Sequence, residues 1–62
     1  MKTNELLKIL KKAGCYPLRK GKGSHQIWYS PITEETCVVP IHPSKEIGTG
    51  LVIKIRKTLL GE

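Results

Sequence analysis

Two amphipathic segments at the ends of the chain, with short β-rich runs between them, most constrain what this sequence can fold into. In the first segment, apolar residues recur at helical spacing and lysines fall largely on the other face, which predicts a helix over residues 4–13. Its apolar residues are Leu6, Leu7, Ile9, Leu10 and Ala13. The last segment repeats the pattern with Leu51, Val52, Ile55 and Leu59. The sequence therefore predicts a helix at each end.

Local signals indicate where these helices begin and end. Thr3 and Thr49 are each predicted to be an N-cap, because a threonine hydroxyl can accept a hydrogen bond from a free N–H of the first turn. Glu5 in the first turn complements the positive end of the helix. Gly14 and Gly61 are predicted to end the two helices.

The region between the helices predicts an antiparallel meander. Residues 15–19, 25–30 and 36–40 are the expected strands, separated by a turn at 20–24 and a turn at 31–35 and followed by a loop at 41–48. Pro17 favours an edge strand or a strand start, because proline lacks a ladder donor. We therefore expect one α+β domain over residues 1–62 with the order α-β-β-β-α. Both helices are expected to pack on one face of a three-stranded antiparallel sheet, leaving the other face open.

Size and charge limit the function. A domain of 62 residues buries only roughly 60% of the surface of its unfolded chain, so any site is expected to be shallow, open or completed by a partner. Eleven Lys and Arg against five Asp and Glu give a net charge of +6, which favours nucleic acid as the partner and an acidic protein second. Lysines that only keep the domain soluble are the alternative. The sequence shows no signal peptide or apolar run of membrane-spanning length, so we expect a cytoplasmic protein.

The cysteines are expected to be reduced thiols in or near the core. Cys15, His25, Cys37 and His42 carry the usual zinc-ligating groups, but they form no paired short-spacing motif such as C-x-x-C. We therefore expect no metal and no cofactor.

The stretch with most chemical capacity is residues 21–28, where a cationic glycine turn leads directly into His25. A neutral imidazole can take the proton of an RNA 2′-hydroxyl, so that this oxygen attacks the adjacent phosphorus. Lys20, Lys22 and backbone N–H groups of the turn, including that of Gly23, can stabilise charge on the phosphate. The alternative is a histidine at a strand start that hydrogen-bonds a loop.

Two further residues are weighed as catalytic support. Ser24 adjoins His25, but adjacent strand residues point to opposite faces, so we rank it as a turn or positioning residue. His42 offers the second imidazole of a base-and-acid pair, although its flanking prolines also suit a stiff structural loop.

Other RNA contacts are open to two interpretations. Trp28 can stack on an unpaired base or lie in the core, and strand alternation puts it on the opposite side from His25, Ile27 and Tyr29. Lys54 and Lys57 can contact phosphates or form a solvated helix face.

Short motifs in a fixed order resemble those of the HicA toxin family. They are Gly14-Cys15-Tyr16 after the first helix, Lys22-Gly23-Ser24-His25, Val39-Pro40-Ile41-His42, and Gly48-Thr49-Gly50 at the start of the last helix. One departure is Cys15, where the family more often has an aromatic residue.

This resemblance has specific implications for fold, activity and partners. It implies a double-stranded-RNA-binding-domain-like fold and a metal-independent endoribonuclease, an mRNA interferase, in which His25 is catalytic. It also implies neutralisation by a HicB-type antitoxin in a hetero-oligomer. Two alternatives are a double-stranded-RNA-binding module without catalysis and a basic protein that binds only an acidic partner.

Overall fold

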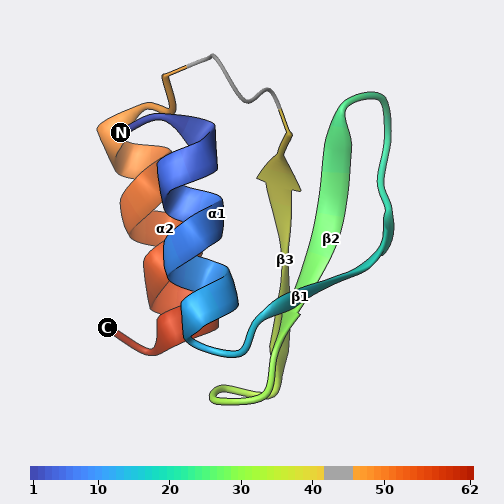
Figure 1. Cartoon of the computed structure of the whole chain (residues 1–62), viewed down its shortest axis with the longest axis vertical. Coiled ribbons are helices and arrows are strands. Elements are labelled where there is room, and N and C mark those ends of the chain that lie inside the picture. The colour runs from blue at the N-terminus through green and yellow to red at the C-terminus, as the bar shows by residue number, and fades with distance from the viewer. Residues whose placement is uncertain (42–45) are drawn as a thin grey trace.

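The protein has an α+β fold whose elements follow the predicted order. The computed structural model describes residues 1–41 and 46–62, and Figure 1 shows the whole chain. The elements are α1 (Thr3–Lys12), β1 (Tyr16–Lys20), β2 (His25–Ser30), β3 (Glu35–Pro40) and α2 (Thr49–Leu60). No helix in these described ranges is both long and apolar enough to cross a membrane.

The elements form two layers. The three strands make an antiparallel sheet in the order β1-β2-β3, and the two helices lie side by side against one of its faces (Figure 1). In the part of the chain that the structure describes, the opposite face of the sheet carries no helix, as the sequence predicts. All five residues of β1 are exposed, which confirms the expectation from Pro17 that this is an edge strand.

The core lies between the helices and the sheet. Its buried hydrophobic side chains are Leu6, Leu10, Cys15, Trp28, Val39, Ile47, Ile55 and Leu59. The periodicity of the two helices predicted half of this set, namely Leu6, Leu10, Ile55 and Leu59. Leu51, which the pattern also placed in the stripe of the last helix, is 40% exposed at the start of α2.

The N-terminal ends of both helices differ from prediction. Thr3 and Thr49 are the first helical residues, and the N-cap positions belong to Lys2 and Gly48, neither of which makes a side-chain capping bond. Thr3 is instead buried, with 1% of its surface exposed. The predicted caps were wrong because each helix starts one residue earlier than the threonine pattern indicates.

The C-terminal ends confirm the two glycine signals. Gly14 has φ +99°, and its N–H donates to Lys11 O at 3.0 Å while the Cys15 N–H donates to Leu10 O at 2.9 Å. This pair of bonds is the Schellman arrangement, which satisfies the last carbonyls of α1. Gly61 ends α2 with φ +73°.

The strands agree closely with the predicted ranges, and one irregularity interrupts β1. Pro17 pairs with Trp28, but Arg19 and not Leu18 pairs with Ile27, so Leu18 is an extra residue in the strand. Such a β-bulge leaves one residue unpaired and changes the side to which the following side chains point. The register of β2 against β3 is regular from the His25–Pro40 pair to the Ser30–Glu35 pair.

Hydrogen bonds join the turn after β2 to the end of α2. The buried Ser30 hydroxyl donates to the Leu59 carbonyl and accepts from the N–H groups of Ile32 and Thr33 at 3.2 and 3.3 Å. The Thr33 hydroxyl donates to Thr58 O at 2.7 Å. Two carbonyls that the helix leaves without intrahelical donors are thereby satisfied by the sheet.

Candidate functional site

The turn between β1 and β2 is held in shape by its own backbone. The Gly21 N–H donates to His25 O at 2.9 Å, and the His25 N–H donates to Lys22 O at 3.2 Å. Gly23 has φ +62°, a left-handed conformation that side-chain-bearing residues adopt at a cost. The turn therefore presents His25 as the first residue of β2, as predicted from sequence.

The His25 ring is exposed and is oriented by one contact. Its Nδ1 lies 3.0 Å from the carbonyl oxygen of Lys22. A carbonyl oxygen only accepts hydrogen bonds, so this contact needs the proton on Nδ1. In the neutral ring Nε2 then carries the lone pair, and it is the nitrogen available to take a proton from a ligand.

A shallow hollow of about 240 Å³ adjoins this ring. It is lined by Lys20, Gly23, Ser24, His25, Gln26 and Ile41. The Ile41 N–H donates to Ser24 O at 2.8 Å, which attaches the chain after β3 to the turn. An open hollow is what the length of the chain leads us to expect.

Sequence reasoning missed two residues of this hollow. Gln26 accepts a hydrogen bond at Oε1 from Trp28 Nε1 at 3.2 Å, which orients its amide. Ile41 reaches the hollow because Pro40 pairs with His25 in the sheet. Strand pairing could have indicated Ile41, whereas nothing in the sequence marks Gln26.

The other predicted site residues divide into two groups. Lys20, Gly23 and Ser24 come together at the hollow, and Lys22 contributes its carbonyl to the orientation of the His25 ring. Lys54 and Lys57 lie on α2 and do not line the hollow, so any contact they make with RNA is separate from it.

Two predictions about aromatic and imidazole groups have different outcomes. Trp28 is 1% exposed and belongs to the core, so of the two interpretations left open the structure favours the core and not the RNA contact: the helices cover the face of β2 to which its ring points. His42 lies outside the described residues, and its catalytic role stays a prediction.

The turn also offers backbone donors. Within residues 1–41 and 46–62, no backbone hydrogen bond uses the N–H of Lys22, Gly23 or Ser24. Successive free N–H groups in a turn with a left-handed residue form a concave site suited to an anion. The cationic side chains of Lys20 and Lys22 are in the same turn region and are exposed.

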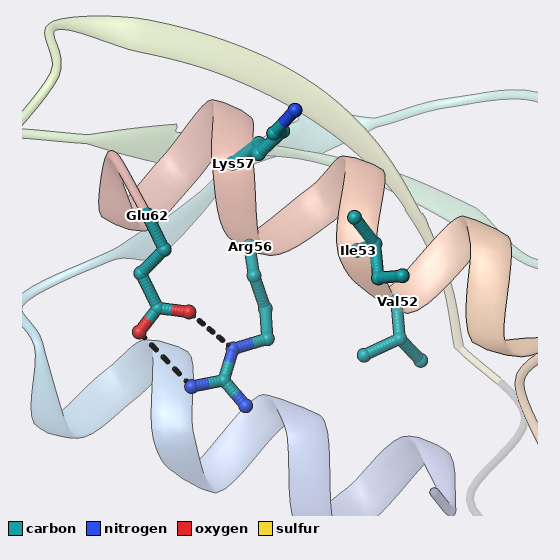
Figure 2. Close-up of a pocket in the computed structure, with 5 residues that line it drawn as sticks. All are labelled: Val52, Ile53, Arg56, Lys57 and Glu62. Atoms are coloured by element: carbon teal, nitrogen blue, oxygen red, sulfur yellow. Dashed lines mark hydrogen bonds and ion pairs between the residues drawn. The ribbon is translucent and has the colours of Figure 1, made fainter.

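A larger hollow, of about 450 Å³, lies elsewhere, along the outer side of α2. Figure 2 shows its lining residues, Val52, Ile53, Arg56, Lys57 and Glu62. The Arg56 Nε and the Glu62 Oε1 are 2.6 Å apart, and hydrogen bonding to this guanidinium lowers the pKa of Glu62. Of its charged groups, Arg56 and Glu62 are paired with each other and only Lys57 is not, whereas the smaller hollow adjoins an imidazole, so we take the smaller hollow as the candidate site.

The thiols are structural. Cys15 is buried, and its Sγ lies 3.7 Å from Leu59 O. Desolvation raises the pKa of the half-buried Cys37 thiol, and the charge of Lys54 opposes this shift. Raised pKa values make a thiol a poorer nucleophile near neutral pH. Among the residues described, no three His, Cys, Asp or Glu side chains gather as metal ligands.

Fold and site together define a class: small basic α+β proteins in which an exposed imidazole follows a cationic glycine turn. Comparison with protein-family models identifies the family within this class. The model described as the HicA toxin of bacterial toxin-antitoxin systems matches residues 3–59, and the chain belongs to this family. Membership implies an antitoxin partner. Searches of curated proteins and of solved structures gave no match.

Proposed function

We propose that this HicA-family toxin is an endoribonuclease that cleaves messenger RNA, with His25 as its general base. The observation that carries the proposal is the contact between His25 Nδ1 and Lys22 O at 3.0 Å, which leaves Nε2 as the acceptor of the exposed ring. A neutral imidazole in this tautomer is a suitable proton acceptor near neutral pH.

The proposed reaction uses the 2′-hydroxyl of the substrate as its nucleophile. His25 Nε2 takes the 2′-OH proton, and the 2′ oxygen forms a bond to the adjacent phosphorus. The bond from phosphorus to the 5′ oxygen breaks, and that oxygen takes a proton from the imidazolium or from solvent. The products are a 2′,3′-cyclic phosphate and a 5′-hydroxyl end. DNA lacks the 2′-hydroxyl, which would make the enzyme specific for RNA.

Charge that develops on the phosphate needs donors nearby. The free N–H groups of Lys22, Gly23 and Ser24 and the side chain of Lys20 are suitable, because preformed donors at a developing negative charge lower the barrier. In this scheme Ser24 positions the phosphate through its backbone and is not a nucleophile. The scheme uses no metal ion.

An experiment with one matched variant tests this proposal. Labelled messenger RNA is incubated with wild-type protein and with His25→Ala in EDTA, and the new ends are analysed for the cyclic phosphate. Acid–base help is typically worth about 10²–10⁴ in rate, so we expect His25→Ala to lose at least 100-fold. Lys8→Ala, which alters an exposed side chain of α1, is the control for contaminating nucleases and should cleave like the wild type.

Equal cleavage by the wild type and His25→Ala would contradict the catalytic assignment. Tight RNA binding by both proteins without cleavage by either would instead support a non-catalytic RNA-binding module, which the α-β-β-β-α order also permits. A partner antitoxin of the HicB type is expected to cover His25 and suppress cleavage. Coexpression with that antitoxin should therefore protect RNA.

A further inference from the structure

The sheet face that no helix covers presents two tyrosines side by side. Tyr16 of β1 and Tyr29 of β2 are directly opposite in the antiparallel register, and their ring centroids are 5.6 Å apart at a tilt of 56°. Opposite residues of a strand pair project from the same face. Tyr16 keeps 47% of its surface exposed and Tyr29 is half-buried, so the Tyr16 ring is the more accessible of the two.

This face continues to the candidate active site. His25, Ile27 and Tyr29 alternate along β2 and therefore share one side of the sheet. At roughly 3.3 Å per residue, His25 and Tyr29 are about 13 Å apart along the strand, a span of a few nucleotides. The half-buried Ile27 lies between them, beside Val38 of β3, which is 51% exposed.

Positively charged residues gather toward the His25 end of the sheet. Arg19 pairs with Ile27 and so projects on this side, and Lys20 and Lys22 follow toward the His25 end. Glu34 lies in the turn beyond the tyrosines, and Glu35 is opposite the buried Ser30, so Glu35 projects from the helix-covered side. The cations near the His25 end therefore attract a polyanion to that end of the face.

We propose that the open sheet face is a binding subsite for single-stranded RNA, in which a base a few nucleotides from the cleaved phosphate stacks on the Tyr16–Tyr29 pair and Arg19 contacts the backbone. The inference rests on the proposed function, since it locates the substrate that His25 cleaves. Aromatic rings on a flat sheet stack on bases, and single-stranded nucleic acid is bound through such rings and flanking cations. The cations at the end of the face where the exposed imidazole lies are the reason to choose RNA as the occupant, because that end is where the proposed cleavage takes place.

The test measures binding separately from cleavage. The probe is a fluorescein-labelled, single-stranded 2′-O-methyl oligonucleotide, which lacks the free 2′-hydroxyl and so is not cut, and its affinity is measured by fluorescence anisotropy. A second probe has the same backbone with abasic residues in place of the bases. Tyr16→Leu removes the aromatic ring and keeps an apolar side chain, whereas Tyr16→Phe keeps the ring.

We expect Tyr16→Leu to weaken binding of the base-bearing probe by about 5- to 150-fold, as removal of one stacking aromatic does. Tyr16→Phe should bind like the wild type, and Tyr16→Leu should bind the abasic probe as the wild type does. Arg19→Gln should weaken both probes and reduce the salt dependence of binding, because it removes a phosphate contact. Circular dichroism of each variant confirms that the fold is kept.

Unchanged affinity of Tyr16→Leu for the base-bearing probe overturns the inference, and so does the absence of probe binding by the wild type. If Tyr16→Leu impairs only the binding of a HicB-type antitoxin, the face is a protein interface and the inference is also wrong. The cleavage assay with His25→Ala tests the proposed function independently of these binding measurements. Binding that depends on Tyr16 without any cleavage would refute the catalytic proposal and leave the RNA subsite in place.

Discussion

The Ser30 hydroxyl donates a hydrogen bond to the Leu59 carbonyl and joins the end of β2 to the last turn of α2. Both residues are fully buried, and the same hydroxyl accepts two backbone N–H groups of the following turn. One side chain thus organises three backbone groups at the end of the sheet that lies away from His25. The exposed turn before His25 lies at the opposite end of β2 from this contact.

Replacing Ser30 with alanine should destabilise the protein without direct damage to the site. The substitution leaves a buried carbonyl and two N–H groups without their partner, which costs about 1–3 kcal/mol. For a domain of this size each kcal/mol lowers Tm by roughly 4–8 °C, measurable by circular dichroism. Thr36→Ala, at an exposed position of β3, is the control and should leave Tm nearly unchanged. A Tm for Ser30→Ala equal to that of the control would contradict the role given to this hydroxyl.

Gly23→Ala should impair the turn through its backbone conformation. A Cβ at Gly23 would meet no atom within 4 Å, but φ is +62°, where a non-glycine residue costs about 1–2 kcal/mol. Gly23→Asn should be tolerated better, because asparagine visits this region more readily. Gly50→Ala is the matched control: it also meets no atom, and inside a helix alanine is favoured. Equal effects of Gly23→Ala and Gly50→Ala on Tm would exclude the conformational explanation.

Cleavage should increase from mildly acidic to neutral pH. A general base acts only when unprotonated, and imidazoles take up their proton in this range. Single-turnover rates with saturating RNA at several pH values measure the profile, which avoids a contribution from product release. A rate that does not change from mildly acidic to neutral pH would contradict an imidazole as the general base.

Alkaline pH should destabilise the wild type more than a Cys37→Ala variant. Burial raises the pKa of Cys37 in the folded protein, so the folded state favours the protonated thiol. This stabilisation is complete below the pKa of an unfolded thiol, about 8.5, and is lost as pH rises through the higher pKa of the folded state. The difference in free energy of unfolding between the two proteins, from urea titrations, should therefore fall above about pH 8.5. A constant difference from neutral to alkaline pH would argue against a desolvated thiol.

Periodicity and glycine signals were enough to predict the fold from sequence. Apolar residues at helical spacing identified both helices, and the β-branched run before Pro40 identified β3. His25–Ser30 was predicted with its observed bounds, because the glycine turn before it and Pro31 after it leave little choice. These signals are local, so the sequence carries them without knowledge of the tertiary contacts.

The errors came from contacts between distant segments. Threonine is a residue type that favours the N-cap position, but Thr3 is the first helical residue of α1 and is buried there. The direction of Trp28 depends on which face of β2 the helices cover, and pairing alone does not determine that. The hydrogen bond from Trp28 orients the amide of Gln26, and it likewise depends on which face of β2 the helices cover. The bond from Ser30 to Leu59 likewise has no signature in either segment.

The β-bulge in β1 determines which of its cations lies on which side of the sheet. Because Leu18 is unpaired, Arg19 is opposite Ile27 on the open face and Lys20 is opposite Gln26 beside the hollow. If Leu18 were instead paired in a regular ladder, Arg19 would be opposite Gln26 and Lys20 opposite His25, so the two cations would exchange sides. One unpaired leucine therefore decides which cation a ligand on the open face meets, although it adds no charge of its own.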